Sequence, residues 1–293
     1  MFEQLRSPLV FRPKTIADIN PARLDLDNCI LFAGGTYLMS QSSYPSQEVK
    51  DFINLGSIAE LGRMNRVDQV AEAGAMVTIQ RFMDENRLTM RESLYEIFSS
   101  IATETVRNQA TLGGSICVKD SILSMPCILS CLDTQVEIRT LSRRPVNKWM
   151  SIGSLYSVNG KLLLNDRSVV LRMKINLEPF THYYFNSTAS PFVDKENAVL
   201  MGLFCSAAGT SDKPSRIRLV LAYPKGGLHR SREIENDIMS MGFPLSPAKI
   251  NSMTQALQNE VQAEHKNVNA YQLETTARLF QAALFNLNTK FLS

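Results

Sequence analysis

The fold is decided by two glycine-centred stretches, Val106-Arg107-Asn108-Gln109-Ala110-Thr111-Leu112-Gly113-Gly114-Ser115 and the shorter Leu31-Phe32-Ala33-Gly34-Gly35-Thr36. In each stretch a glycine pair ends an apolar or helical run and is flanked by small residues and a threonine. No bulky side chain stands in the way, so consecutive backbone N–H groups can converge on an anion, and the threonine hydroxyl adds a donor. Two such loops predict a clamp that holds a two-phosphate ligand from both sides.

Length and composition narrow the class of protein. The chain has 293 residues, enough for a large core divided into two or three compact units. Its 44% hydrophobic and 20% charged residues are typical of globular proteins. Lys and Arg number 31 against 28 Asp and Glu, an excess too small to favour nucleic-acid binding. The N-terminus lacks the apolar core of a signal peptide, and no apolar run has membrane-spanning length. We therefore expect a soluble, cytoplasmic protein.

The cysteines and histidines predict no metal site and no catalytic residue. An odd number of cysteines in a chain of this size indicates reduced thiols: Cys29, Cys117, Cys127, Cys131 and Cys205. Cys127 and Cys131 share one face of a predicted helix, and we interpret them as buried apolar residues because no Cys-x-x-Cys spacing accompanies them. The three histidines, His182, His229 and His265, are far apart in sequence. Their spacing neither supports nor rules out a histidine-built metal site or a catalytic triad.

The N-terminal part alternates short strands and helices. Apolar runs predict strands at 30–32, 51–55 and 70–78, and the spacing of apolar residues over 94–101 predicts an amphipathic helix that leads into the second glycine loop. Pro126 is expected to open a further helix. Residues 171–177 alternate apolar and charged side chains, which predicts a half-buried strand. The order favours a mixed α/β arrangement.

The C-terminal part has a different pattern. We expect a domain boundary at Glu178-Pro179, followed by an antiparallel sheet with strands near 182–185, 198–208 and 217–222. Three helices should close the chain. The middle one is expected to begin with Ser246 as N-cap and Pro247 at the first helical position.

The two stretches also carry a resemblance to a known family. The order of elements, together with 32–36 and 106–116, resembles the FAD-binding subunit of the molybdenum hydroxylases, the flavoprotein or medium chain of xanthine dehydrogenase and carbon monoxide dehydrogenase. The most specific match is Arg107-Asn108 ahead of Ala-Thr-Leu-Gly-Gly. Phe11-Arg12-Pro13 and Leu132-Asp133 support it. The resemblance covers essentially the whole chain and is strong over residues 1 to about 140.

This resemblance implies an α+β fold. Residues 1–178 would form an FAD-binding domain of the PCMH type, with α/β subdomains at about 1–56 and 57–178, and residues 179–293 a C-terminal domain of a small antiparallel sheet with helices. In that family the two glycine loops wrap the FAD diphosphate. The cofactor-binding residues implied are Phe32, Ala33, Gly34, Gly35, Thr36, Tyr37, Leu38, Ala110, Thr111, Gly113, Gly114 and Ser115.

The function implied by the resemblance is electron transfer. A molybdopterin-containing large subunit would hydroxylate the organic substrate, a small subunit with [2Fe-2S] clusters would relay electrons, and the flavin of this oxidoreductase subunit would pass them to NAD⁺ or another acceptor. The chemistry belongs to the flavin, and the protein binds and tunes it. No residue of this chain is therefore expected to attack the substrate.

Four positions depart from the family pattern: Tyr37 stands where an acidic residue is common, Ser115 where an asparagine is, Leu123 where an aspartate is, and Asn186 where a lysine is. Two alternatives follow. One is another flavoenzyme similar to the UDP-N-acetylenolpyruvoylglucosamine reductases, although their Gly-Ile-Pro-Gly and Asn-Ala-Gly-Ala-Tyr-Gly segments are absent. The other is a structural subunit that has lost tight FAD binding.

Overall fold

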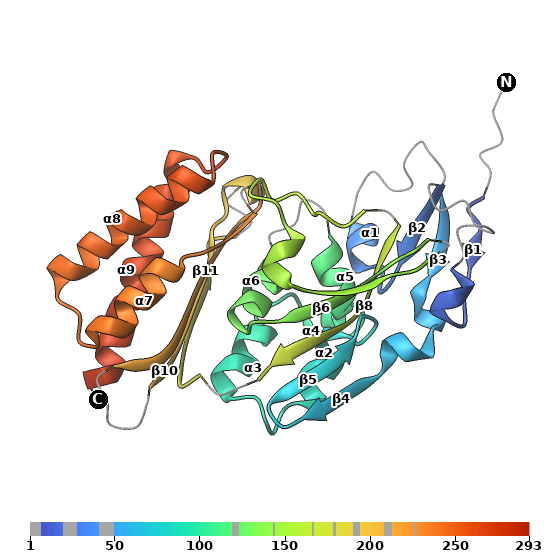
Figure 1. Cartoon of the computed structure of the whole chain (residues 1–293), viewed down its shortest axis with the longest axis horizontal. Coiled ribbons are helices and arrows are strands. Elements are labelled where there is room, and N and C mark those ends of the chain that lie inside the picture. The colour runs from blue at the N-terminus through green and yellow to red at the C-terminus, as the bar shows by residue number, and fades with distance from the viewer. Residues whose placement is uncertain are drawn as a thin grey trace.

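Three sheets follow one another along the long axis of the molecule (Figure 1). A computed structural model describes residues 7–19, 28–40, 50–118, 123–142, 144–165, 167–177, 180–189, 194–207, 213–225 and 227–292. Each sheet is built from one part of the chain, and helices pack between the second and third sheets and outside the third. The predicted α+β class is confirmed.

The first sheet consists of short parallel strands. Strands β1 (Val10–Phe11), β2 (Cys29–Phe32) and β3 (Asp51–Asn54) pair in the order β1-β3-β2. Strands β2 and β3 confirm the predictions for 30–32 and 51–55, and a five-residue helix α1 (Thr36–Ser40) follows the first glycine pair. This part thus has the mixed α/β order that the sequence predicts.

The second sheet is antiparallel. Its strands β4 (Met64–Val67), β5 (Val70–Gly74), β6 (Gln135–Thr140), β7 (Asn147–Ser151) and β8 (Ser168–Asn176) lie in the order β4-β5-β8-β6-β7. In β8 the buried side chains of Met173 and Ile175 alternate with Arg172 and Lys174, as the period-two pattern predicts. The sheet therefore buries one face against the helices.

These helices are α2 (Ile79–Glu85), α3 (Glu92–Ser99), α4 (Glu104–Arg107), α5 (Leu112–Cys117) and α6 (Ser124–Cys131). Three details differ from expectation. Strand β5 ends at Gly74, short of the predicted 78, because the next residues bond to the second glycine loop. The extra helix α4 separates α3 from that loop, and α6 begins two residues before Pro126.

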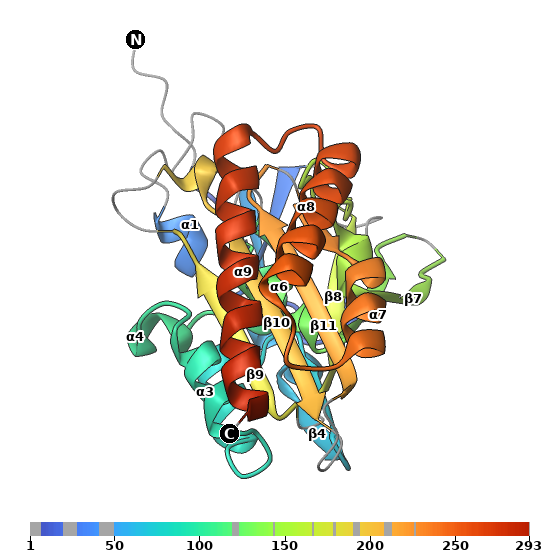
Figure 2. The ribbon, with the colours of Figure 1, turned by 90° about the vertical axis from the view of Figure 1, so that its left-hand side faces the viewer.

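The third sheet confirms the predicted antiparallel arrangement. Strands β9 (His182–Ser187), β10 (Leu200–Ala207), β11 (Pro214–Tyr223) and the unpredicted β12 (Gly227–Arg230) lie in the order β12-β11-β10-β9. Helices α7 (Arg232–Met241), α8 (Pro247–Glu264) and α9 (Ala270–Leu292) cover one face (Figure 2). Ser246 caps α8 as expected, since its side chain accepts the N–H of Lys249.

One core crosses from the second sheet to the third. Leu200 and Phe204 of β10 belong to the same buried cluster as Cys127 and Ile128 of α6, whereas Met201 packs toward the C-terminal helices. Both faces of the third sheet are thus buried, which explains why β10 reads as a continuous apolar run.

Polar contacts reinforce this junction. Asp133, just after α6, accepts bonds from Arg218 Nε at 2.8 Å, Arg230 Nη1 at 2.7 Å and Arg216 Nη2 at 3.3 Å. Glu235 holds Arg230 from the other side, with both oxygens at 2.9 Å. The predicted boundary at Glu178-Pro179 falls outside the described residues, and the division into domains stays a prediction. Among the described helices, none is long and apolar enough to cross a membrane.

Candidate functional site

The two glycine loops lie against each other. A Cβ atom on Gly34 would stand 1.9 Å from the carbonyl oxygen of Gln109 and 3.3 Å from the Cα of Ala110. A Cβ on Gly114 would in turn lie 3.6 Å from the Cβ of Ala33. Residues far apart in the sequence therefore form one surface, as a clamp requires, and only glycine at position 34 allows the approach.

The first loop has unused backbone donors. It leaves β2, turns at Gly35 with a φ of +73° and enters α1 at Thr36. Among the described residues, no acceptor bonds the N–H groups of Gly34, Gly35 or Thr36. All seven predicted residues of this loop, 32–38, are partly exposed. The loop can therefore donate several backbone hydrogen bonds to a ligand.

The second loop has its donors engaged. Its backbone forms a short ladder with the segment after β5: the N–H of Ile79 donates to Ala110, the N–H of Leu112 to Val77 and the N–H of Gly113 to Ala75, each at 2.9 Å. Thr111 is the N-cap of α5, because its Oγ1 accepts the N–H of Gly114 at 3.0 Å. The glycine pair thus lies in the first turn of a helix.

Ser115 completes this pattern. Its N–H donates to the carbonyl of Thr111, and its hydroxyl donates to the carbonyl of Leu112 at 2.7 Å. In this structure α5 and its ladder use the N–H groups of Gly113, Gly114 and Ser115, which the sequence suggests as donors to an anion. Thr111 and Gly113 are buried, whereas Ala110, Gly114 and Ser115 are partly exposed beside the first loop. The second loop can therefore contact a ligand through its partly exposed residues, whereas the backbone N–H donors lie in the first loop.

Arg107, the residue that makes the second motif specific, is buried with 8% of its surface exposed. Its Nε donates to Gln80 Oε1 at 3.0 Å, and Nη1 donates to the carbonyls of Ser99 and Ala102, both at 2.7 Å, and of Ile101 at 3.3 Å. These bonds join α2 to the end of α3 and the start of α4. Arg107 therefore positions the loop that follows it.

The far end of α5 is also fixed. The hydroxyl of Tyr156 donates to the carbonyl of Ile116 at 2.6 Å. Burial raises the pKa of Tyr156, which keeps the hydroxyl protonated and able to donate. Side-chain hydrogen bonds thus hold both ends of α5, from Thr111 at its start and from Tyr156 at its end.

The four departing positions fall in different settings. Tyr37 lies in the first turn of α1, and Ser115 lies in α5. Leu123 is buried with a φ of +55° and precedes α6, while Asn186 is exposed on β9 in the third sheet.

A cavity of about 370 Å³ lies elsewhere, against the second sheet and lined in part by Glu60, Glu72, Glu137, Arg139 and Arg172. Arg172 forms ion pairs with Glu72 and with Glu137 Oε2, the latter at 2.6 Å. None of the twelve predicted cofactor-binding residues lines it. Glu72 and Glu137 are thus paired with Arg172, and the cavity is separate from the glycine-loop surface.

Comparison with known proteins places this arrangement in a family. Residues 2–176 match the model of the FAD binding domain in molybdopterin dehydrogenase. The xanthine dehydrogenase FAD-binding subunit of Escherichia coli is 26% identical over 174 residues, 58% of each chain. A 6-hydroxypseudooxynicotine dehydrogenase complex subunit alpha of Paenarthrobacter nicotinovorans is 23% identical over 116 residues, 39% of each. The chain thus aligns with less than two thirds of the length of these relatives.

Solved structures superpose on nearly the whole of this chain. Quinoline 2-oxidoreductase from Pseudomonas putida 86 superposes with a TM-score of 0.79 at 17% identity, covering 99% of this chain and 100% of that one. Carbon monoxide dehydrogenase from Hydrogenophaga pseudoflava gives a TM-score of 0.78 at 17% identity, covering 96% of both. At this identity the likeness shows the fold. The family model spans more than half of the chain, so the protein belongs to the family of FAD-binding domains of molybdopterin dehydrogenases, and its cofactor is FAD.

Proposed function

We propose that this chain is the FAD-binding electron-transfer subunit of a molybdenum hydroxylase. It would receive electrons from the [2Fe-2S] clusters of a partner chain and deliver them to NAD⁺ or another acceptor. The observation that carries the proposal is the surface where Gly34 packs on Gln109, beside three backbone donors that no described residue accepts from. A cytoplasmic location is part of the same proposal.

The first glycine loop suits the diphosphate of FAD. Two negative charges that leave water need several hydrogen-bond donors, because an unpaired anion costs several kcal/mol or more. Gly34, Gly35 and Thr36 offer adjacent N–H groups without a side chain that would block the approach. Ala110, Gly114 and Ser115 would limit the site from the other side by contact. The twelve residues predicted from the sequence stay our proposed cofactor contacts, with these two different roles.

The flavin, when bound, supplies both one-electron and two-electron chemistry, which suits a carrier between iron–sulfur clusters and a hydride acceptor. The residues of this chain bind and orient it. We propose no catalytic residue here, because hydroxylation of an organic substrate would take place in a molybdopterin-containing large subunit. The names of the relatives, a xanthine dehydrogenase subunit and a subunit of a dehydrogenase complex, support partners of this kind.

The proposal is tested first by flavin content. The purified chain should retain or take up one FAD, seen as flavin absorbance after dialysis. Gly34→Ala should lower FAD affinity at least about tenfold with the fold retained, since the new Cβ would force the two loops apart. Gly153→Ala is the matched control, because nothing lies within 4 Å of that Cβ position. A colourless chain that fails to take up FAD would contradict the proposal and favour a structural subunit.

The acceptor and the partners need separate measurements. The bound flavin is photoreduced without oxygen and mixed with NAD⁺; reoxidation would identify NAD⁺ as an acceptor. Purification from the native host should recover a molybdopterin subunit and an iron–sulfur subunit with this chain. A chain that purifies alone and oxidises NADPH with an enolpyruvyl sugar nucleotide would instead support the reductase alternative.

A further inference from the structure

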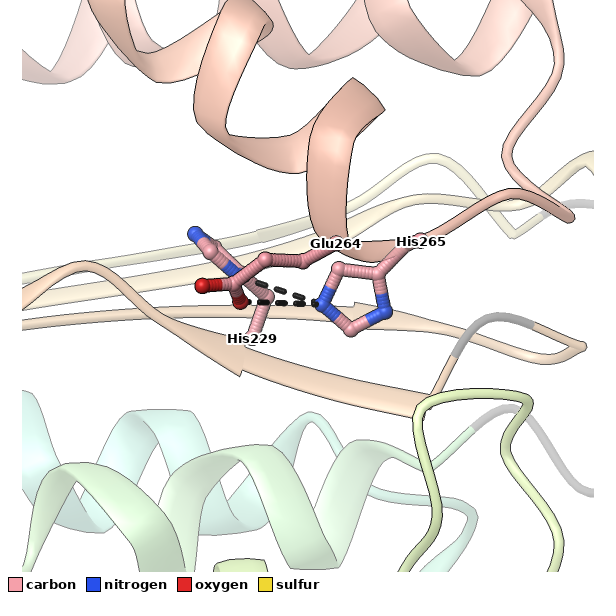
Figure 3. A group of neighbouring side chains, drawn as sticks. All are labelled: His229, Glu264 and His265. Carbon is pink, nitrogen blue, oxygen red and sulfur yellow. Dashed lines mark hydrogen bonds and ion pairs between the residues drawn. The ribbon is translucent and has the colours of Figure 1, made fainter.

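Three side chains from the C-terminal part converge at the end of α8 (Figure 3). Nδ1 of His229, on β12, lies 3.1 Å from Nε2 of His265 and 3.2 Å from Oε2 of Glu264. Nε2 of His265 lies 3.9 Å from the same carboxylate oxygen. One nitrogen from each imidazole and one oxygen thus surround a common point.

The orientation of His265 is set by its other nitrogen. Its Nδ1 lies 3.1 Å from the carbonyl oxygen of Val158, and because a carbonyl can only accept, Nδ1 carries the hydrogen. In the neutral ring Nε2 then carries no hydrogen, and its lone pair is directed at His229. A backbone carbonyl in this role is one of the common outer partners of a metal-binding histidine.

His229 has no satisfactory neutral tautomer without a further ligand. If Nδ1 carries the hydrogen and donates to His265, Nε2 is left buried without a hydrogen-bond partner among the described residues. If Nε2 carries it, that group faces Glu260 Oε1 at 3.5 Å. Nδ1 then presents a lone pair, which faces the lone pair of His265 Nε2 and the carboxylate oxygen Oε2 of Glu264. A cation between the three atoms removes this conflict.

The spacing fits one class of ion. Bonds of about 2.0–2.1 Å in a tetrahedral site place neighbouring ligand atoms about 3.3 Å apart, close to the separations of 3.1, 3.2 and 3.9 Å found here. Two imidazoles and a carboxylate are zinc ligands, whereas Mg²⁺ and Ca²⁺ prefer oxygen alone. We propose that His229, Glu264 and His265 form a binding site for a divalent transition-metal ion of the zinc class.

The surroundings favour such an ion. The side chains of His229 and His265 are 1% and 2% exposed, and that of Glu264 is 58% exposed. The imidazoles are thus buried, whereas the carboxylate is exposed to solvent. An ion could enter on the carboxylate side, and water could complete its coordination there. Glu264 is the last residue of α8, so the negative end of the helix dipole also attracts a cation.

The position indicates a structural role. The ion would join β12 to the end of α8, and through the Val158 carbonyl to a turn that precedes β8 of the second sheet. Backbones are already close there: a Cβ on Gly227 would lie 2.5 Å from the carbonyl oxygen of Ser157. A bound ion would hold this junction, far along the chain from the glycine loops.

The test uses the full-length chain without a polyhistidine tag, because a tag binds the same ions. After treatment with a chelator and dialysis, Zn²⁺ is titrated in competition with a zinc indicator, and bound metal is counted by mass spectrometry. We expect one Zn²⁺ per chain, a melting temperature that rises with Zn²⁺ concentration, and no binding of Mg²⁺. X-ray absorption at the zinc edge should show two imidazole ligands.

Variants decide whether this site holds the ion. His265→Gln should abolish binding, and Glu264→Gln, an isosteric change at an exposed side chain, should weaken it on the order of tenfold or more. His182→Gln, at the third histidine, is the matched control and should bind as the unaltered chain does. The proposal is overturned if the unaltered chain binds no Zn²⁺ at micromolar concentration, or if Glu264→Gln and the control bind it equally well.

Discussion

At the scale of single residues, the residue that makes the second glycine motif typical of the family has a structural role. In the sequence, Arg107 is part of the most specific match to the family, and it is not among the predicted cofactor-binding residues. The guanidinium is buried and donates to one side-chain amide and three backbone carbonyls. It acts on the cofactor site through the position of α4 and the loop after it.

We therefore predict that Arg107→Met lowers the free energy of unfolding by at least about 2 kcal/mol, because buried carbonyls without a donor are each costly. Urea unfolding of the FAD-free chain measures this. Arg278→Met is the control: Arg278 is 76% exposed, pairs only with Glu274 among the contacts described, and should change stability by less than about 0.5 kcal/mol. Equal effects of both changes would contradict the structural role of Arg107.

The buried cysteines make a second prediction about single residues. Burial disfavours the charged thiolate and raises the pKa of Cys205 to about 12, and it raises the pKa of Cys131 well above its ordinary value. At pH 8 the Cys205 thiol is therefore almost entirely protonated. Both thiols should resist a disulfide reagent in the native chain, and all five should react in urea. Mass spectrometry of the modified sites checks this, and fast native labelling of Cys205 would contradict it.

At the scale of elements, the structure assigns different tasks to two loops that look alike in the sequence. In the first loop, the N–H groups of Gly34, Gly35 and Thr36 have no acceptor in the part of the chain that the structure describes. In the second loop, the N–H groups of Gly113, Gly114 and Ser115 bond within α5 or to the segment after β5. The difference arises because Thr111 caps α5 while its neighbours form a ladder with residues 75–79. Neither pairing is visible in a local pattern, since both partners lie on another part of the chain.

Thr111→Val tests the cap, because the substitution keeps the shape and removes the oxygen that accepts the N–H of Gly114. We expect a loss of stability of about 1 kcal/mol in the FAD-free chain, measured by urea unfolding. Thr111→Ser keeps the oxygen and should retain most of the stability. If Thr111→Val instead left the FAD-free stability unchanged and reduced only FAD affinity, the hydroxyl would be a ligand rather than a cap.

Strong local patterns predicted the elements well. The alternation over 171–177 gave β8, and Ser246-Pro247 gave the start of α8. The four residues of β12 were missed because their pairing with β11 defines them, and no pattern of that length stands out. For the same reason His229 and His265 appeared unrelated: one is on β12 and the other follows α8, and only the packing of the helix on the sheet brings them together.

At the scale of the whole molecule, the second and third sheets share a core. Buried residues of β10 and β11 belong to the same cluster as those of α6 and the second sheet. Asp133 binds three arginines of the third sheet beside this core. A shared core of this kind should make the two parts unfold together, whatever the boundary between domains.

Asp133→Asn tests this coupling. Asparagine has the same size and tolerates the φ of +50° at this position, so the change removes mainly the charge. We expect a loss of about 1–3 kcal/mol, because Arg216 and Arg218 lose their carboxylate partner in a half-buried setting. In calorimetry the single transition of the chain should move to lower temperature as a whole. Asp68→Asn is the matched control, since Asp68 has a φ of +53° and is exposed, and it should leave the transition in place. A variant whose transition splits into two would show that the two sheets unfold independently and that the shared core does not couple them.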